Sequence, residues 1–297
     1  MMQIIRVNDI NKKYINDEIA VCIGNFDGIH LGHQALINEV LKSNLKHGLI
    51  SFEPHPIKVL VDKNYKTLMT LDDKIEYLKD TLDYLIIIDF DLNFSQKKAD
   101  EFISFMKLNS IREIVCGYDF HFGIHASGNT SMLKDNFKLH IIEPIENNSC
   151  VVKTQKIRSL IIDGDIEAAN KLLGRTYTIN GIVVYGKQLG RTIGFPTANL
   201  NACKTLLPAN GVYATKTLID NQEYLSMTNI GHNPTFNHND NIVVETNIID
   251  FEGNLYGKRI EVSFYKLIRL ERKFASVDDL KAELKKNQDF VKNNLKK

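Results

Sequence analysis

Two patterns of apolar residues alternate along the first 175 residues of the chain. Short continuous apolar runs, typical of strands buried on both faces, are separated by longer segments whose apolar residues recur at helical spacing. The runs that predict strands are residues 19–24, 48–52, 84–90, 112–120 and 138–145, and the segments that predict helices are residues 31–45, 70–80 and 97–108. Strands and helices that alternate at this spacing indicate an α/β domain, in which helices cover both faces of a parallel sheet.

The pattern changes after a predicted helix at residues 157–174, which ends at Gly174. Runs rich in β-branched and aromatic residues follow, separated by glycine, asparagine and aspartate, and they predict an antiparallel barrel or sandwich. These runs are residues 177–186, 211–219, 222–231, 242–251 and 259–269. The last segment, residues 276–295, predicts an amphipathic helix with Ser276 as its N-cap and Asp279 three residues later. We therefore expect two domains, residues 1–175 and residues 176–297.

Composition narrows the classes of protein to which this chain can belong. Its 297 residues carry 37 Lys and Arg against 36 Asp and Glu, so the formal net charge of +1 gives no general attraction to nucleic acid or anionic membrane. The N-terminus has no apolar segment typical of a signal peptide, and no run of about 18 apolar residues occurs. The four cysteines lack CxxC spacing and are expected to be buried reduced thiols. We expect a cytoplasmic protein with no nucleic-acid or membrane partner; self-association is possible but not indicated.

The first candidate site is the turn between the first buried strand and the helix that follows it, GNFDGIHLGH from Gly24 to His33. A strand that leads through glycines into a helix presents backbone amides and the positive end of the helix dipole, which together favour an anion. His30 and His33 lie on one face of the first helical turn, where imidazole donors can stabilise charge that develops on a phosphate. A metal site is an alternative, although no third ligand is near in the sequence, and so is a surface pair without a function.

The second candidate site is the loop GRTIGFPTAN, which runs from Gly190 to Asn199. Pro196 fixes the backbone just before Thr197 and Asn199, so the loop can present a hydroxyl and an amide oxygen to a hard cation that ATP phosphates already hold. A turn without a function explains the glycines but not the Thr and Asn after the proline. The nearby segment GIVVYGKQ resembles a P-loop, but its middle residues predict a strand, and Gln188 stands where a hydroxyl must hold magnesium. The P-loop interpretation is therefore rejected.

Both segments resemble motifs of one enzyme family. GNFDGIHLGH, FEPHP at residues 52–56 and GYDFHFG at residues 117–123 resemble the FMN adenylyltransferase half of bacterial FAD synthetases, within the nucleotidyltransferase superfamily. PTAN, together with GVYAT, TNIGHNPTF, VVETNIIDF and LYGKRIEV, resembles the riboflavin kinase family. The resemblance spans nearly the whole chain. It implies a Rossmann-like nucleotidyltransferase domain, then an antiparallel β-barrel kinase domain with a C-terminal helix, and two magnesium-dependent reactions of ATP that convert riboflavin to FMN and FMN to FAD.

The resemblance also implies roles for individual residues. In the adenylyltransferase, catalytic His30 and His33 would contact ATP phosphates, within an ATP site of Gly24, Asn25, Phe26, Asp27, His30, His33, Thr154 and Arg158. In the kinase, Glu245 would be the general base that takes the proton from the ribityl hydroxyl of riboflavin. The kinase ATP site would comprise Gly190, Arg191, Thr197 and Asn199, of which Thr197 and Asn199 would bind magnesium. The flavin-binding residues would be His55, Asp119 and Arg269.

One departure from the family pattern leaves a second hypothesis open. The family has Ser-Ser-Thr before the Ile-x-Arg of the helix that closes the ATP site, whereas this chain has Lys153, Thr154 and Gln155 there. Lys153 could contact phosphate as a point charge. The alternative to a bifunctional enzyme is a riboflavin kinase whose N-terminal domain only binds nucleotide or flavin. A flavin- or nucleic-acid-binding module without catalysis is a third hypothesis, which the near-neutral charge and the intact PTAN loop oppose.

Overall fold

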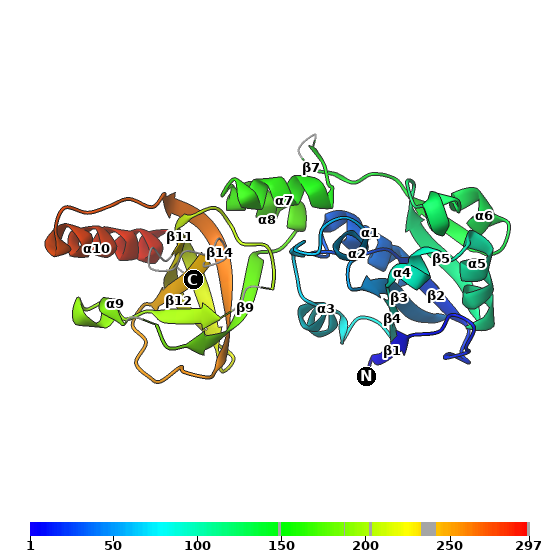
Figure 1. The fold of residues 1–297 in the computed structure, drawn as a ribbon, viewed down its shortest axis with the longest axis horizontal. Coiled ribbons are helices and arrows are strands. Elements are labelled where there is room, and N and C mark those ends of the chain that lie inside the picture. The colour runs from blue at the N-terminus through cyan, green and yellow to red at the C-terminus, as the bar shows by residue number, and fades with distance from the viewer. Residues whose placement is uncertain (148–149, 187, 202–203, 233–241, 296–297) are drawn as a thin grey trace. The chain divides into compact units, whose positions relative to one another are not determined.

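The computed structural model describes residues 1–147, 150–186, 188–201, 204–232 and 242–295. The chain folds into two compact units, Met1–Thr154 and Gln155–Lys297 (Figure 1). Cys22 and Cys116 are free and buried, as predicted, and Cys150 is free and half-buried. Cys203 and the part of TNIGHNPTF after His232 lie outside the described residues. Within the described residues, no helix combines the length and apolar character that crossing a membrane requires.

The first unit is built on a six-stranded parallel sheet with the strand order β1-β4-β3-β2-β5-β6. Its strands are β1 (Gln3–Val7), β2 (Ile19–Ile23), β3 (Lys46–Glu53), β4 (Tyr84–Asp89), β5 (Ile111–Gly117) and β6 (Lys138–Ile142). The five strands predicted from apolar runs are confirmed. β1 is additional, and its mostly exposed residues lack such a run because it lies at the edge of the sheet.

Helices cover both faces of this sheet (Figure 1). They are α1 (Leu31–Val40), α2 (Pro56–Leu60), α3 (Leu71–Leu78), α4 (Leu92–Ser95), α5 (Ala99–Leu108) and α6 (Thr130–Lys134), and the unit also has a 3₁₀ turn at Ile124–Ala126 and a ribbon of β7 (Glu146–Asn147) and β8 (Cys150–Val151). Alternate residues of the buried strands face two separate apolar cores. In β2, Val21 lies in one core with Phe102 of α5, whereas Cys22 lies in the other core with Leu36 of α1.

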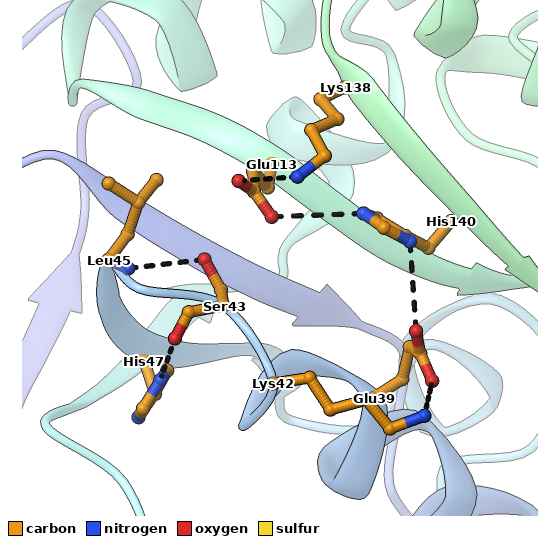
Figure 2. A network of polar contacts seen from close by, with 8 residues as sticks. All are labelled: Glu39, Lys42, Ser43, Leu45, His47, Glu113, Lys138 and His140. Carbon is orange, nitrogen blue, oxygen red and sulfur yellow. Dashed lines mark hydrogen bonds and ion pairs between the residues drawn. The ribbon is translucent and has the colours of Figure 1, made fainter.

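A chain of polar contacts fixes the C-terminal end of α1 to the sheet (Figure 2). The His140 imidazole on β6 lies between two carboxylates, 3.7 Å from Glu39 Oε1 at the end of α1 and 3.7 Å from Glu113 Oε2 on β5. Lys42 and Lys138 extend this chain, with their Nζ atoms 2.6 Å from Glu39 and 3.0 Å from Glu113, respectively. Solvent-accessible pairs of this kind contribute little stability individually. Together they hold α1 against β5 and β6, and so fix the helix that begins directly after His30.

The second unit is a closed antiparallel barrel with the strand order β10-β13-β12-β11-β14-β9. Its strands are β9 (Tyr177–Val184), β10 (Ala198–Asn201), β11 (Gly211–Ile219), β12 (Gln222–His232), β13 (Ile242–Ile248) and β14 (Arg259–Arg269), and the short helix α9 (Leu189–Thr192) connects β9 to β10. The predicted antiparallel domain is confirmed as a barrel rather than a sandwich, because β9 pairs with both β10 and β14 and so closes the sheet.

Three further helices belong to the barrel unit. α10 (Val277–Asn294) begins at its predicted N-cap, where the Ser276 hydroxyl accepts a hydrogen bond from the backbone amide of Asp279 at 3.1 Å. α7 (Thr154–Ile162) leads into α8 (Ile166–Leu173), whose Asn170 side chain donates to the Phe264 carbonyl of β14 at 2.9 Å. α8 packs on β9 and β14, and the compact units divide between residues 154 and 155, whereas residue 175 is the boundary expected from the sequence.

Hydroxyl groups occupy part of the barrel interior. The buried hydroxyls belong to Thr215, Thr217, Ser226, Thr228 and Thr246. Thr215 Oγ1 lies 2.8 Å from Ser226 Oγ and 2.9 Å from Thr228 Oγ1, and Thr228 in turn reaches Thr246 at 3.0 Å. Buried hydroxyls that satisfy one another in this way avoid the cost of desolvation without a partner.

Replacing Thr215 by valine should destabilise the barrel unit. Valine has nearly the same shape, but it leaves the hydroxyls of Ser226 and Thr228 with one partner fewer in the interior. The free energy of unfolding should fall by about 1–3 kcal/mol, which urea denaturation of the full chain can measure. Thr178→Val is the matched control, because it removes a half-buried hydroxyl of the same barrel. An equal loss in both variants would contradict the prediction.

Candidate active sites

The first cavity lies at the carboxyl edge of the parallel sheet. β2 is flanked by β3 on one side and β5 on the other, so the chain leaves the ends of β2 and β5 in diverging directions. Open α/β sheets bind ligands at such a topological switch point. A cavity of about 1070 Å³ lies here. The residues that follow both strands line it, among them Gly24 and His33 after β2 and Gly117 and Asp119 at the end of β5.

The loop between β2 and α1 has an unusual backbone. Phe26 and Ile29 have left-handed φ angles of 49° and 43°, and Gly28 has a φ of 83°. Left-handed non-glycine residues persist only where their surroundings fix them, and both side chains are fully buried here. Asp27 contributes a further anchor, because its Oδ1 accepts a hydrogen bond of 2.6 Å from the amide of Leu68. The buried side chains of Phe26 and Ile29 and the hydrogen bond of Asp27 therefore fix the conformation of the loop.

His30 and His33 form one stacked pair at the entrance to α1. Their ring centroids are 3.6 Å apart and the rings are inclined by 14°. His30 is the N-cap of α1, and its Nδ1 accepts a hydrogen bond of 3.3 Å from the backbone amide of His33. Nε2 of His30 must therefore carry the proton, which it donates to Thr154 Oγ1 at 3.0 Å. Gly32 permits this arrangement, because an added Cβ would lie 3.2 Å from the His30 ring.

Burial favours the neutral form of both imidazoles. Burial lowers the pKa of His30 from 6.5 to about 4. Burial also holds the pKa of His33 well below its usual value, with smaller contributions from His30 and Lys74. Nδ1 of His33 is buried and has no hydrogen-bond partner among the described residues. A ligand in the cavity can supply that partner.

The predicted adenylyltransferase residues fall into three groups. The residues that line the cavity are Gly24, Asn25, His30, His33, Asp119 and Thr154. Phe26 and Asp27 lie beneath the loop and hold it, because both are buried. The third group is not among the cavity-lining residues that the structure describes: Arg158 is buried on α7, one helical turn after Thr154. His55 caps α2 by accepting from the amide of Ile57 at 3.2 Å, and its ring stacks on Tyr65.

An aromatic wall, which no sequence motif indicated, also lines this cavity. It consists of Phe52, Phe90, Phe94, Phe102, Phe120 and Phe122. Phe52 lies near the end of β3, Phe90 follows β4, and Phe120 follows β5. Phe52, Phe90 and Phe120 are each the last residue of a predicted strand. Because parallel strands end at the same edge of a sheet, that shared position was the signal in the sequence that could have found these three residues. Lys153 also lines the cavity.

The second cavity lies on the outer face of the barrel, has a volume of about 350 Å³, and is lined in part by Leu280 and Leu284 of α10. Its polar lining includes Gln188, Thr197, Asn229, Glu245, Asn247, Arg269, Glu271 and Arg272. Glu245 on β13 is the direct cross-strand partner of Asn199 on β10 and of Asn229 on β12. Directly paired residues of an antiparallel sheet point to the same face, so these three side chains form one row.

Of the residues predicted for the kinase, Gly190, Thr197, Glu245 and Arg269 line this cavity. Arg191 lies in α9 and Asn199 lies beside Glu245 in the register, but neither is among the lining residues that the structure describes. The glycine at position 190 is required, because a Cβ there would lie 2.2 Å from the carbonyl oxygen of Phe195.

The PTAN loop has supports that the sequence analysis missed. The Asn247 side chain on β13 donates to the Pro196 carbonyl at 2.7 Å, directly before Thr197. Gln288 on α10 donates to Asn247 Oδ1 at 3.1 Å. The C-terminal helix is therefore connected through two side-chain amides to the backbone that presents Thr197.

A cation–aromatic cluster closes another side of the second cavity. The guanidinium groups of Arg269 and Arg272 lie 5.4 Å and 5.1 Å from the centre of the Phe274 ring. Glu283 of α10 pairs with both, at 3.4 Å from Arg269 Nε and 2.7 Å from Arg272 Nη2. Burial lowers the pKa of Arg269, and the Glu283 carboxylate acts in the opposite direction. The guanidinium nevertheless stays charged, because its unperturbed pKa is so high.

The fold and its two cavities define a two-unit enzyme, with an α/β unit of the nucleotidyltransferase type and a barrel of the riboflavin kinase type. The family model described as FAD synthetase matches residues 12–160, and that described as riboflavin kinase matches residues 173–295. The protein from Buchnera aphidicola subsp. Schizaphis graminum named bifunctional riboflavin kinase/FMN adenylyltransferase is 39% identical, over 95% of this chain and 96% of its own length. The protein of the same name from Haemophilus influenzae is 37% identical over 98% of each chain. This chain belongs to the bifunctional riboflavin kinase/FMN adenylyltransferase family.

A solved structure covers nearly the same length. A crystal structure from Streptococcus pneumoniae, described as a macrolide-efflux protein, is 32% identical and superposes with a TM-score of 0.90 over 98% of this chain and 99% of that chain. The efflux description is shared neither by the two family models nor by the two curated relatives described above.

Acid should destabilise the first unit in a pH window that His30 defines. Its folded-state pKa of about 4 lies below the value of 6.5 that an exposed histidine has, so the unfolded chain binds more protons between these two pH values. The stability that depends on neutral His30 is complete above pH 6.5 and is lost as the pH falls toward 4. The shift corresponds to about 3 kcal/mol.

Calorimetric unfolding of the full chain at a series of pH values tests this expectation. His30→Asn is the informative variant, because asparagine is also a good N-cap but does not titrate. The thermal transition of its first unit should depend less on pH in this window. The same pH dependence in the variant and the natural protein would show that another group is responsible.

Proposed function

We propose that this protein phosphorylates riboflavin to FMN at the barrel cavity and adenylylates FMN to FAD at the cavity of the first unit, with ATP as donor in both reactions. The observation that carries the proposal is that, in each unit, residues of the family motif line a cavity together with polar groups that the reaction requires. Riboflavin, FMN and FAD are the substrates and products that the names of the family and of the curated relatives indicate.

The geometry of the first cavity supports nucleotide binding. The loop after β2 leads into the N-terminus of α1, where backbone amides and the helix dipole favour phosphate. His30 and His33 lie at that point, and Thr154 holds His30 through its hydroxyl. An anion favours the protonated form of a nearby imidazole, so bound phosphates would raise the pKa of His33, whose Nδ1 has no partner among the described residues, and strengthen it as a donor.

The opposite side of the same cavity supports flavin binding. Its volume of about 1070 Å³ is at the upper end of the roughly 300–1,000 Å³ typical of single small-molecule sites, which leaves room for a second substrate. The aromatic wall from Phe52 to Phe122 offers ring faces and edges for an isoalloxazine. Asp119 at the end of this wall can accept hydrogen bonds from the polar edge of the flavin.

The barrel cavity supports phosphoryl transfer. Glu245 lies in a row with Asn199 and Asn229, where its carboxylate can take the proton from the terminal ribityl hydroxyl. The hydroxyl of Thr197 and the amide oxygen of Asn199 are hard oxygen ligands, the type that Mg²⁺ accepts beside ATP phosphates. These residues fit a magnesium ion brought in with ATP, and that ion would neutralise charge on the phosphates. Arg269 would lie beside the flavin.

Both reactions follow directly from these assignments. In the first, the deprotonated ribityl oxygen bonds to the γ-phosphorus of ATP, the bond to the β-phosphate oxygen breaks, and ADP leaves with FMN as product. In the second, a phosphate oxygen of FMN bonds to the α-phosphorus of a second ATP, and pyrophosphate leaves. His30 and His33 stabilise the charge that develops in this second step.

The alternative of a kinase with a silent first unit rests on Lys153 and Gln155, which replace small hydroxyl residues of the family pattern. The hydroxyl that this chain keeps, on Thr154, is the one that binds His30 Nε2 at 3.0 Å. Lys153 lines the same cavity and can contact phosphate as a point charge. Both observations favour an active adenylyltransferase.

Two substitutions should separate the activities. Glu245→Gln keeps the size of the side chain but removes the base, so FMN formation from riboflavin should fall by about 10²–10⁴-fold while FAD formation from supplied FMN continues. His33→Ala should abolish FAD formation and leave FMN formation unchanged. Chromatography of the flavins formed with ATP and magnesium, in parallel reactions that start from riboflavin and from FMN, measures both activities.

The natural protein decides between the hypotheses in the same assay. FAD from both starting flavins supports the bifunctional enzyme. FMN that accumulates from riboflavin, with no FAD in either reaction, supports the kinase-only alternative. FMN production that survives Glu245→Gln, or FAD production that survives His33→Ala, would overturn the role assigned to that residue.

Asn247→Ala should weaken the kinase at the level of ATP binding. Without the Asn247 amide, the Pro196 carbonyl loses its donor and the PTAN loop loses its connection to Gln288. A lost hydrogen bond of about 1.4 kcal/mol corresponds to a rise of about tenfold in the KM for ATP, while adenylylation of FMN should not change. Asn254→Ala, in an exposed turn, is the matched control. An unchanged KM for ATP in Asn247→Ala would exclude this support.

A further inference from the structure

Lys74 on α3 is a buried lysine, with only 6% of its surface exposed. α3 begins with a capping box, in which Thr70 and Asp73 exchange hydrogen bonds between side chain and backbone at 3.2 Å. This cap fixes the first turn of the helix, and Lys74 is the next residue. Lysine is almost never fully buried unless it is paired, so its burial requires partners that replace water.

The partners of Lys74 belong to the segments that lead into the first cavity. Nζ donates to the carbonyl oxygen of Asn25 at 2.8 Å and to Ser51 Oγ at 2.8 Å. The Ser51 hydroxyl donates in turn to the same Asn25 carbonyl at 3.0 Å. A cation, a hydroxyl and a backbone carbonyl therefore form a closed triangle beneath the loop between β2 and α1.

Several charged or titratable groups face Lys74. The carboxylates of Asp27 in the loop and Glu53 on β3 favour its protonated form, whereas burial is the larger effect and lowers its pKa from 10.5 to about 8. His33 on α1 is the third group, and the lysine cation is one of the causes that keep the pKa of that imidazole low. Lys74 thus lies within electrostatic reach of a proposed catalytic histidine.

We infer that Lys74 is a positioning residue for adenylyl transfer: its cation holds the Asn25 carbonyl inward and so fixes the phosphate-binding loop. This inference rests on the function proposed for the first unit. The peptide bond between Asn25 and Phe26 is planar and trans, so a carbonyl held toward the core directs the amide of Phe26 to the opposite side. The left-handed Phe26 that follows needs such a support.

The charge of Lys74 has a second consequence. A hydrogen bond from a charged donor is roughly twice as strong as a neutral one, and a buried cation beneath the loop also attracts the phosphates above it. Deprotonation of Lys74 would remove both effects at once. Adenylyl transfer should therefore require the protonated lysine.

Four variants of the full chain test this role. Lys74→Met removes the charge and the donors at similar length, Lys74→Arg keeps a charge, Ser51→Ala opens the triangle, and Lys79→Met removes an exposed lysine just after the same helix. A loop displaced by about 1 Å can cost about 100-fold in rate. We expect a loss of this size in kcat/KM for FAD formation in Lys74→Met, a smaller loss in Ser51→Ala, and none in Lys79→Met.

The kinase of the same chain is the internal control for folding, because its cavity lies in the other unit. FMN formation from riboflavin should be unchanged in all four variants. Full FAD formation in Lys74→Met would overturn the inference. An equal loss of both activities would also overturn it, because the lysine would then serve folding rather than positioning. A natural protein that forms no FAD would instead refute the proposed function of the first unit.

The pH profile of FAD formation supplies a readout that a purely structural role does not change. In the natural protein, kcat/KM should fall as the pH rises through about 8, the pKa of Lys74 in the free enzyme. In Lys74→Arg the remaining activity should lack this alkaline limb, because the guanidinium keeps its proton to about pH 12. The same alkaline limb in Lys74→Arg and the natural protein would overturn the inference.

Discussion

β2 is hydrogen-bonded in parallel to β3 on one side and to β5 on the other, and all five of its residues are buried. A strand in that position cannot slide, because a shift by one residue would exchange the side chains that face the two cores. Gly24, which follows the carboxyl end of β2, therefore lies beside the end of β5. The loop, the histidine pair, the cavity-lining residues after β5 and the cavity between them all depend on this pairing.

In the barrel, strand register fixes the positions of the site residues in a different way. Antiparallel register places Glu245 between Asn199 and Asn229, and ring closure through β9 leaves that register no freedom. The helix after the barrel then contributes Gln288, which holds Asn247 and through it the carbonyl of Pro196. In the parallel sheet, the polar side chains of the site follow the ends of strands. In the barrel, they lie side by side along paired strands, and hydrogen bonds connect this row to the PTAN loop.

The sequence predicted those parts of the two sites that are local in the chain. The Gly24–His33 turn and the PTAN loop are contiguous, and their glycines, histidines and proline act on their immediate neighbours. Lys74 could not be found in this way, because its helix alone suggests an exposed lysine and only Asn25 and Ser51, from other elements, bury it.

The other differences have the same physical cause. Asn247 and Gln288 are 41 residues apart, and nothing in either segment indicates the other. The flavin role of His55 stays a prediction from its motif, and the structure adds that its imidazole caps α2 and stacks on Tyr65. The compact units divide after residue 154 rather than at residue 175, and helical periodicity says which face of α8 is apolar but not that β9 and β14 receive it.

The charge state of the first cavity follows from burial. His30 and His33 are neutral there, and Lys74 keeps its proton only by a narrow margin near neutral pH, because desolvation disfavours every positive charge beneath the loop. Phosphates bound as proposed would shift the pKa of His33 in the opposite direction, since an anion at hydrogen-bond distance favours the protonated form of an imidazole and His33 Nδ1 has no partner among the described residues. The positive charge of this imidazole would then develop when the nucleotide binds. Such a site stays folded without a ligand, where buried cations so close together would repel one another, and gains a cation for its substrate.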